Sequence, residues 1–353
     1  MFTDLTGKTR LKIGLHTHTT LSDGHKTPEE AASVYKAAGY DAIAITDHWV
    51  YGAGGEINGL TILSGCEYNV DGVDEWTGVH ETYHIVGVGM IRDPEIPEDY
   101  LSNHDGRIRD RVRDMVDRIR KAGGLAVLAH PAWSLNTSEQ ILGCAEFDAT
   151  EIYNSVSDWG MSDRPYSGVI VDQIASYGLF LPLLATDDTH YYDGDQCRGW
   201  VAVEADAAEE LGLVEALRQG KFYATMGPEV HLERISPTAV KLTCSPAVKV
   251  AFLSNAVWTS GRMVRGEDIT EAVYELKRHE IYVRAEVTDA DGRVGYSNII
   301  PVLAWIPSGR SERLFSATPT GTTRTSNAPS CPRWILLGSS VSAPRSCAAW
   351  PRN

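Results

Sequence analysis

Apolar residues in the first two hundred positions gather in short continuous runs, which are separated by segments with helical spacing. Continuous rather than alternating apolar character is typical of strands buried on both faces, as in a parallel sheet covered by helices. The runs therefore predict strands at 11–15, 42–46, 61–65, 84–89, 125–130, 149–154, 180–186 and 199–204.

Helical patterns fall between these runs. The segment that begins at Thr27 has a capping threonine, a proline at the first helical position and Glu30 at the third, and it ends at a glycine. The segments 107–124 and 207–220 carry apolar stripes at helical spacing with glycine stops. This alternation of strands and helices predicts an α/β barrel of seven or eight units.

The pattern changes at about residue 228, where apolar and polar residues begin to alternate and Asp-Gly at 291–292 marks a hairpin turn. We expect a barrel over 1–227 and a small antiparallel β module over 228–303. From Ala304 onward the chain has six arginines, no lysine and one acid, Glu312. This Ser-, Pro- and Thr-rich composition predicts a disordered tail over 304–353, or an aberrant one read out of frame.

Charge and composition exclude several classes of protein. The formal net charge of −15 argues against a nucleic-acid polymer as partner, because phosphate-backbone binding rests on Lys and Arg. No apolar run approaches the ~20 residues of a membrane helix, and the N-terminus lacks the apolar core of a signal peptide. The six cysteines lack CxxC spacing and indicate reduced thiols. We therefore expect a cytoplasmic protein without a membrane partner.

Histidine and carboxylate side chains recur at the ends of the expected strands. His16 and His18 follow the first strand two positions apart, so an extended backbone projects both to one side. All but His84 lie at or just past a C-terminal strand end, where active sites occur in parallel α/β barrels. One such motif alone would suit a polar loop, but their recurrence favours a metal centre. The residues are His16, His18, Asp23, His48, Glu67, His84, His130, Asp188 and His190.

The ordered motifs "HTHTTLSDG", "AITDH", "GCE", "HIVGVG", "LAHP" and "DDTH" resemble those of the PHP (polymerase and histidinol phosphatase) superfamily over residues 11–227. The β module and the wording "ATDDTH" are similar to a bacterial metallohydrolase branch that includes carbamate-hydrolysing members. The resemblance implies a distorted (β/α)7 barrel of PHP type that holds two to three divalent metal ions, which are Zn, Mn or Fe.

The same resemblance implies three ligand groups, with Glu67 bridging the first and the second. The family often has His or Asp at the position of Asp23, so the metal of the third group stays open. The groups are His16, His18, Glu67 and Asp188; Glu67, His84 and His130; and Asp23, His48 and His190.

Histidine and carboxylate ligands suit Zn(II), Mn(II) and Fe(II) and do not choose among them. Such ions lower the pKa of a bound water from about 15.7 toward about 7, so we expect a metal-bridging hydroxide as nucleophile. Asp47 is the candidate catalytic residue that orients a ligating imidazole, with helix or strand capping as the alternative. Arg164 and Arg198 are candidate substrate-binding cations for a phosphate, with solvated surface charge as the alternative.

These features predict a metal-dependent hydrolase, foremost a phosphoesterase for a small phosphorylated substrate. Two alternatives stay open. The same metal site suits hydrolysis of a carboxyl or carbamate ester, and a non-catalytic accessory PHP module occurs in some polymerases. The apparently complete ligand set and the lack of a polymerase-length partner domain count against the accessory module.

Overall fold

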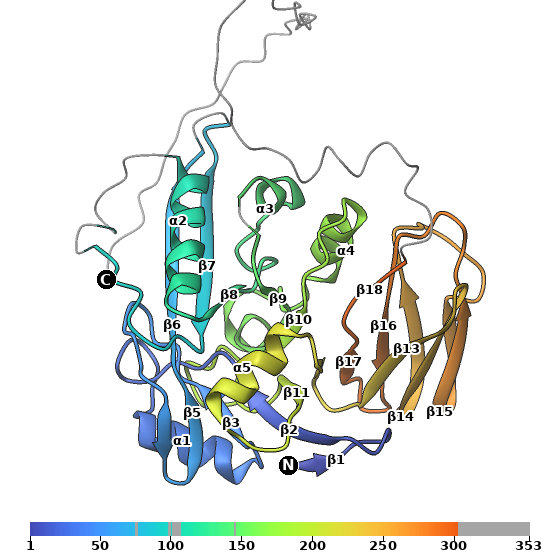
Figure 1. The fold of residues 1–353 in the computed structure, drawn as a ribbon, viewed down its shortest axis with the longest axis horizontal. Coiled ribbons are helices and arrows are strands. Elements are labelled where there is room, and N and C mark those ends of the chain that lie inside the picture. Colours follow the sequence, from blue (N-terminus) through green and yellow to red (C-terminus); the bar gives the residue numbers. More distant parts are fainter. Residues whose placement is uncertain (75–76, 98–99, 101–106, 145, 303–353) are drawn as a thin grey trace, which may run out of the picture. The chain divides into compact units, whose positions relative to one another are not determined.

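The computed structural model describes residues 1–302 except 75–76, 98–99, 101–106 and 145 (Figure 1). The described residues belong to one compact unit, Met1–Trp305. The tail expected over 304–353 lies outside the described residues. The described chain is a mixed α/β fold built on two sheets.

The larger sheet runs in the order β13-β14-β16-β17-β12-β11-β2-β3-β5-β4, with β1, β15 and β18 pairing beside this path. Strands β2, β3 and β5 are parallel to one another, whereas β11 pairs antiparallel with both β2 and β12. The strands of its first half are β1 (Phe2–Thr3), β2 (Thr9–Gly14), β3 (Ala42–Ala44), β4 (Gly55–Ile57), β5 (Leu60–Leu63), β11 (Trp200–Glu204) and β12 (Phe222–Thr225).

The smaller sheet has the order β10-β9-β8-β7-β6. Its strands β8, β9 and β10 are parallel, and β7 is antiparallel to both β6 and β8. The bounds are β6 (Gly65–Val73), β7 (His80–Val88), β8 (Leu125–Leu128), β9 (Ala149–Asn154) and β10 (Leu183–Thr186).

The all-parallel barrel expected from the apolar runs is not what these ladders show, because the described strands form two open sheets. Strand β7 follows β6 after a short connection, which permits only antiparallel pairing. Two isolated parallel bridges nevertheless link segments of the two sheets, one between Thr17 and Thr189 and one between His48 and Glu67. Both bridges involve predicted site residues or their direct neighbours.

Helices cover the sheets between these strands (Figure 1). The capping box predicted for the first helix is confirmed, since the side chains of Thr27 and Glu30 each accept a hydrogen bond from the other's backbone N–H. No described helix combines the length and the apolar character that crossing a membrane requires. The helices are α1 (Pro28–Ala37), α2 (Ile108–Lys121), α3 (Ser138–Cys144), α4 (Gly168–Ser176) and α5 (Glu210–Arg218), and Ser157–Met161 forms a π-helical turn.

One buried apolar cluster spans both sheets and includes Ile13 of β2, Val127 of β8 and Leu183 of β10. The predicted stripe of α2 is buried in a second cluster, where Val112 and Met115 pack near Tyr83 of β7. Because protein interiors are packed as densely as organic crystals, these clusters hold the strand ends in fixed relative positions.

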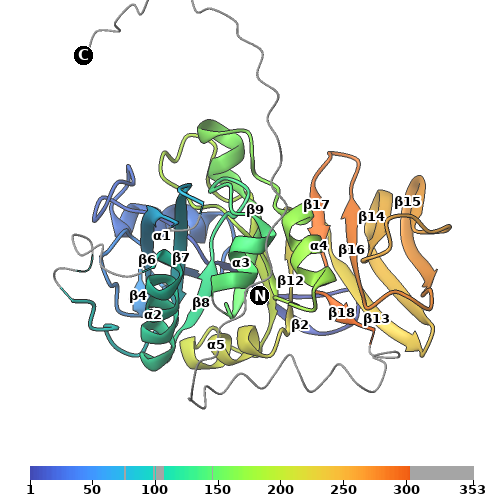
Figure 2. The same ribbon diagram turned by 90° about the horizontal axis from the view of Figure 1, so that it is seen from above.

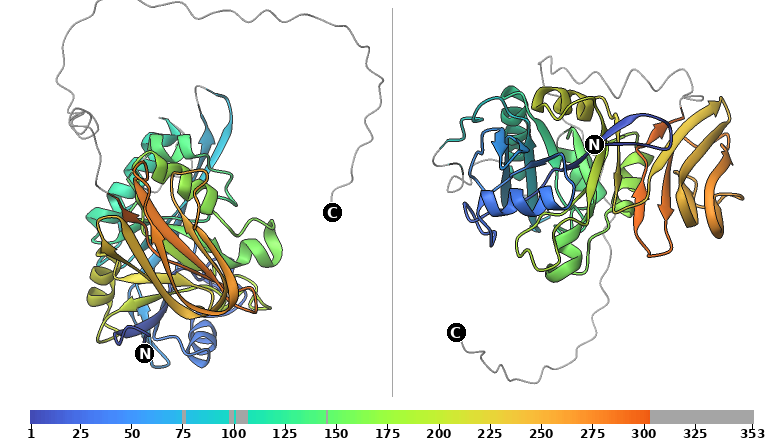
Figure 3. Two further views of the ribbon diagram at one scale, coloured as in Figure 1. Left: turned by 90° about the vertical axis from the view of Figure 1, so that its right-hand side faces the viewer. Right: turned by 90° about the horizontal axis from the view of Figure 1, so that it is seen from below.

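The region from residue 230 onward is antiparallel, as its alternating pattern predicts, and the Asp-Gly pair turns the chain between β16 and β17. Figures 2 and 3 show its strands side by side at one end of the unit. Strand β17 continues the ladder onto β12, so the boundary at residue 227 stays a prediction. The strands are β13 (Val230–Ser236), β14 (Ala239–Leu253), β15 (Met263–Glu275), β16 (Tyr282–Thr288), β17 (Val294–Tyr296) and β18 (Ile300–Pro301).

Candidate metal centre

The structure brings all nine predicted ligands together. Their donor atoms form three groups, within each of which the atoms lie within 4.8 Å of one another. These groups contain the predicted sets, and His18 belongs to the third group as well as the first. The first group is His16, His18, Glu67 and Asp188; the second is Glu67, His84 and His130; the third is His18, Asp23, His48 and His190.

The first group has the dimensions of a tetrahedral metal site. His16 Nε2 lies 3.1 Å from Glu67 Oε2 and 3.2 Å from Asp188 Oδ1. His18 Nε2 lies 3.0 Å from each of the same two oxygens. Tetrahedral ligands bound at about 2.0 Å from an ion are separated from one another by about 3.3 Å. The separations between the two imidazole nitrogens and the two carboxylate oxygens therefore match those around a single tetrahedral cation.

Two buried polar atoms in the cluster lack a hydrogen-bond partner. They are Asp188 Oδ1 and His48 Nδ1. Buried polar atoms in folded proteins are nearly always paired, so such atoms at a cluster of ligand-type side chains indicate a site for an ion. The donor set of imidazole and carboxylate, without thiolate, suits Zn, Mn or Fe.

The electrostatics of the first group favour bound positive charge. Burial opposes the charged imidazole of His18, but the carboxylates of Asp188 and Glu67, each 3.0 Å from its Nε2, outweigh this effect and raise its pKa to about 9. Burial likewise opposes ionisation of Glu67, yet the charges of His16 and His84 hold the pKa of this carboxyl well below its usual range. The carboxylates are therefore ionised and attract a proton or a cation to the same place.

Glu67 uses its two carboxylate oxygens on different sides. Oε2 faces the first group, while Oε1 lies 2.8 Å from His84 Nδ1 and 3.4 Å from His130 Nε2. One carboxylate thus lies between two candidate cation sites.

The third group is the most open. Asp23 Oδ1 lies 3.5 Å from His190 Nε2, and Asp23 Oδ2 lies 3.9 Å from His48 Nε2. The side chain of Asp23 is 57% exposed and that of His48 is 25% exposed, whereas His18 is fully buried. Solvent exposure within the cluster therefore increases from the first group to the third.

Backbone pairing holds the two ligand loops together. The N–H of Asp188 donates to the carbonyl of His16, and the N–H of His18 donates to the carbonyl of Thr189. These bonds belong to the parallel bridge between Thr17 and Thr189. As a result, the loop that follows β2 and the loop that follows β10 cannot move independently.

Two ligands occupy a strained backbone conformation. His130 has φ of 27° and Asp188 has φ of 53°, which is the left-handed region that residues other than glycine rarely adopt. Such residues cost about 1–3 kcal/mol each and cluster at functional sites. The surrounding packing therefore holds both side chains in orientations that an unstrained strand end would not produce.

No protein-family model matches the sequence, and no curated protein matches it significantly. Among solved structures, the chain is similar to a two-domain protein from Bacteroides vulgatus that contains a predicted PHP-like metal-dependent phosphoesterase. The identity is 17% and the TM-score 0.43, over 84% of this chain and 97% of that one.

Two further solved structures are similar to the chain. One is an amidohydrolase from Chromobacterium violaceum with bound sulfate and no metal, at 17% identity and a TM-score of 0.36, over 60% of this chain and 96% of that one. The other is a candidate metal-dependent phosphoesterase from Bifidobacterium adolescentis, at 15% identity and 0.34, over 59% and 94%. Similarity of this size assigns neither a family nor an activity.

Sequence reasoning missed Glu151, which lies behind two of the ligands, His16 and His130. It sits in β9, is 1% exposed, and its Oε1 lies 2.7 Å from His16 Nδ1. The motif "ATEIYN" predicts only a buried strand. The signal that could have identified the residue is a glutamate inside an otherwise apolar run, because carboxylates are almost never fully buried without a partner.

Asp47 lies beside the site but does not contact an imidazole through the hydrogen bonds of its side chain. Its carboxylate accepts from the N–H and hydroxyl of Thr19 at 2.7 and 2.6 Å, and from the hydroxyl of Ser22 at 2.7 Å. These bonds order the loop that carries Asp23. The orienting contact predicted for Asp47 is instead made by Glu151, and a catalytic role for Asp47 stays a prediction.

The two predicted substrate-binding arginines flank the π-helical turn Ser157–Met161. Arg164 is exposed, and its backbone N–H donates to the carbonyl of Ser157. Arg198 pairs with Asp158 at 2.9 Å, and its guanidinium lies 5.7 Å from the ring of Trp159. The Nη1 atom of Arg198 is buried and has no hydrogen-bond partner.

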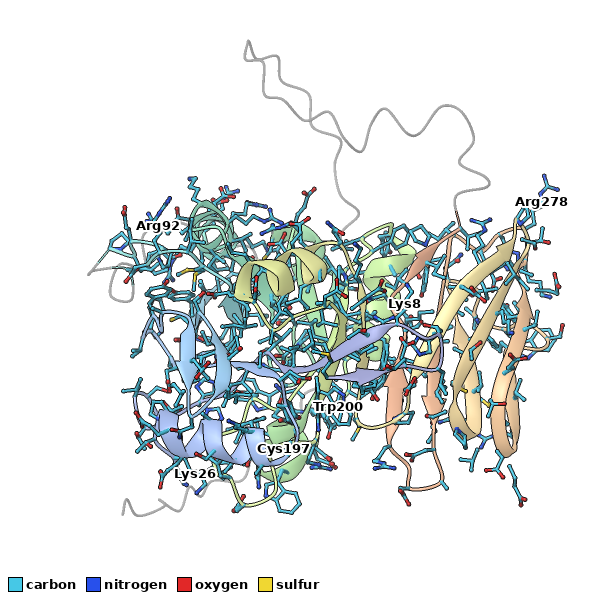
Figure 4. All side chains as sticks on the ribbon, turned by 60° about the horizontal axis from the view of Figure 1, so that its bottom comes forward. Lys8, Lys26, Arg92, Cys197, Trp200 and Arg278 are labelled. Atoms are coloured by element: carbon cyan, nitrogen blue, oxygen red, sulfur yellow. The ribbon has the colours of Figure 1, made fainter. Side chains whose placement is uncertain are left out.

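The backbone of Arg198 is fixed by a carboxylate next to a ligand. Asp187 accepts hydrogen bonds from the N–H groups of Cys197, Arg198 and Gly199 at 2.7 to 2.8 Å. This segment leads to Trp200 at the start of β11, and Figure 4 shows Cys197 and Trp200 on the face that also carries α1. The loop with Arg198 is therefore tied to the loop with Asp188.

Proposed function

We propose that the chain is a metal-dependent hydrolase of the PHP superfamily, foremost a phosphoesterase that acts on a small phosphorylated substrate. The observation that carries this proposal is the assembly of nine His, Asp and Glu side chains into three overlapping donor groups. Ordinary polar loops do not supply a reason for buried imidazoles and carboxylates to converge from strands of both sheets.

The roles proposed for the chain's own residues differ with their burial. Bound divalent cations supply a water of near-neutral pKa and neutralise charge on the oxygens of the substrate. His16, His18 and Asp188 would hold a cation in the closed interior. Glu67 joins that position to the second group. The more exposed Asp23 marks the side from which a substrate reaches the cluster.

Arg198 is proposed to bind an oxygen of the phosphate. Its buried Nη1 is a donor that needs an acceptor, and its position is fixed through Asp187. Charge-assisted hydrogen bonds to phosphate are stronger than those between neutral groups. Arg164, which is exposed and follows the π-helical turn in sequence, is the second candidate cation.

The proposal includes the barrel type and the domain boundaries. We assign the smaller sheet, together with strands β1 to β5, β11 and β12 of the larger sheet, to a distorted (β/α)7 barrel over residues 1–227, followed by a β module over 228–303. The two bridges, Thr17 with Thr189 and His48 with Glu67, support this because they link the sheets on either side of the site. Similar bridges are expected where a barrel is interrupted rather than closed.

A second candidate function is hydrolysis of a carboxyl or carbamate ester at the same donor groups. The observation that favours it is the pairing of Arg198 with Asp158, which reduces the positive charge available to a phosphate. An uncharged ester needs the cations and the nucleophile but no additional arginine.

A substrate panel tests the proposal. The full chain is loaded in turn with Mn, Zn and Fe, and turnover is compared for bis-p-nitrophenyl phosphate, nucleoside monophosphates and p-nitrophenyl acetate. Turnover of phosphate esters supports the phosphoesterase, and turnover of acetate alone supports the second candidate. Bound metal without turnover of any substrate would contradict both and leave the accessory module.

A further inference from the structure

A single buried carboxylate contacts members of two donor groups at once. Glu151 Oε1 accepts from His16 Nδ1 at 2.7 Å, and His16 belongs to the first group. Glu151 Oε2 accepts from the backbone N–H of His130 at 2.9 Å, and His130 belongs to the second group. Neither contact uses one of the ligand atoms that face the cluster.

The contact with His16 determines which ring nitrogen can bind an ion. An ionised carboxylate only accepts hydrogen bonds, so Nδ1 of His16 must carry the proton. The lone pair is then on Nε2, which is the atom that faces Glu67 Oε2 and Asp188 Oδ1. A carboxylate in this position also increases the basicity of the ligating imidazole.

The contact with His130 acts on the backbone. His130 has a φ of 27°, a conformation that requires outside support. The hydrogen bond from its N–H to Glu151 Oε2 provides that support directly from the neighbouring strand β9. The side chain of His130 consequently reaches Glu67 Oε1, at 3.4 Å.

Asn154 extends the contact to a third ligand. Its Nδ2 donates to Glu151 Oε2 at 2.9 Å and to Asp188 Oδ2 at 3.2 Å. Both Asn154 and Glu151 are about 1% exposed, so water does not compete for these bonds. Strand β9 thereby supports His16, His130 and Asp188 although none of its residues is in a donor group.

We infer that Glu151 is a positioning residue that sets the His16 tautomer and the His130 backbone together, and so couples the first and second metal sites. The inference rests on the proposed function, because it concerns ions bound at those groups. It adds a residue that acts through the ligands and does not touch the ions.

The variant Glu151→Gln tests this role because an amide cannot replace both acceptors. Glutamine has only one side-chain acceptor oxygen, which can accept either from His16 Nδ1 or from the N–H of His130. Its NH₂ group then faces the other of these two atoms and cannot accept a hydrogen bond from it. Loss of such a supporting contact lowers metal affinity about 10- to 100-fold. We expect this loss in the dissociation constant for Zn, measured on the full chain by competition with a chelator.

Thr150→Val is the matched control. Thr150 is the preceding residue of β9, is buried, and donates through its hydroxyl to the carbonyl of Leu128 at 3.0 Å. Both variants remove a buried hydrogen bond from one strand, but only Glu151 contacts ligands. We expect Thr150→Val to bind Zn as the wild type does. The d–d absorption of Co(II)-loaded protein should change in Glu151→Gln and not in Thr150→Val.

The outcomes separate the inference from the proposed function. Equal Zn affinity in Glu151→Gln and the wild type would overturn the inference and leave the proposed function standing. A wild type that binds no divalent ion would overturn both. If Glu151→Gln does not fold, long-range ¹H–¹⁵N spectra of the Zn-loaded wild type decide, since they show whether Nδ1 of His16 keeps its proton. An unprotonated Nδ1 would overturn the inference.

Discussion

The Nε2 atoms of His16 and His18 lie 3.2 Å apart in a fully buried setting. Two imidazole lone pairs repel one another at that distance unless a proton or a metal ion lies between them. A shared positive charge between them makes the arrangement favourable, and the oxygens of Glu67 and Asp188 complete the surroundings. The spacing HxH predicts this relationship, because residues two apart in an extended segment project to the same side.

Loss of one of these imidazoles should abolish hydrolysis. His16→Ala removes one donor of the first group, and the remaining three cannot close the site. We expect turnover of the best substrate of the panel to fall below detection in steady-state assays. His25→Ala is the control, because His25 is exposed and outside the donor groups, and it should retain full turnover. Comparable loss in both variants would contradict the assignment.

Removal of Arg198 should affect charged substrates selectively. A hydrogen bond to a charged group contributes about 1.5–3 kcal/mol, which corresponds to about a 10- to 100-fold change in kcat/KM. Arg198→Ala should lose this much with a phosphate ester and change little with p-nitrophenyl acetate. An equal loss with both esters would show that Arg198 supports the loop through Asp158 rather than binding phosphate.

Arg284 should stabilise the packing of the β strands after residue 230 against the rest of the unit. This fully buried side chain pairs with Asp172 of α4 at 2.7 Å and with Glu286 at 2.5 Å. Breaking a buried ion pair costs about 3–5 kcal/mol. Arg284→Ala should lower the free energy of unfolding by that amount in urea denaturation.

The pair of half-exposed Arg293 and mostly buried Asp289 gives the comparison for Arg284. Pairs of this exposure contribute about 0–1 kcal/mol, so Arg293→Ala should unfold at nearly the wild-type urea concentration. If Arg284→Ala were no more destabilising than Arg293→Ala, the buried pair would not fasten the strands.

Acid should weaken the contact that anchors the N-terminal segment. Burial opposes ionisation of Asp4, but hydrogen bonds from Thr6 and Arg10 outweigh it and hold the pKa of this carboxyl well below its usual range. A depressed pKa stabilises the fold above the ordinary value of about 3.9, and this contribution is lost as pH falls below it. The stability difference between the wild type and Asp4→Asn should therefore narrow from pH 5 to pH 3 in urea titrations. A constant difference would contradict this.

The sequence predicts the ligands better than the sheet that holds them. His16, His18, Asp188 and His190 follow apolar runs directly, so a local pattern places them at strand ends. The direction of a strand within its sheet cannot be predicted in this way, because an apolar run has the same pattern in a parallel and in an antiparallel strand. The antiparallel course of β7 depends on how the chain turns between Val73 and His80.

Contacts between distant segments account for the other differences. Glu151 meets His16 across 135 positions of sequence, and no spacing within "ATEIYN" indicates that partner. Arg198 meets Asp158 through a π-helical turn 40 residues earlier. Asp47 is a candidate for orienting an imidazole, but its carboxylate binds Thr19 and Ser22 instead. The sequence pattern therefore predicts the ligands, whereas the residues that position those ligands are brought to them only by tertiary packing.

The number of divalent ions bound per chain at saturation tests the central claim most directly. Elemental mass spectrometry after equilibrium dialysis against Zn, Mn or Fe should give two to three ions for the wild type. His16→Ala should hold at least one ion fewer, because the first group loses a donor. A wild-type chain that retains no ion of any of the three metals would contradict the account.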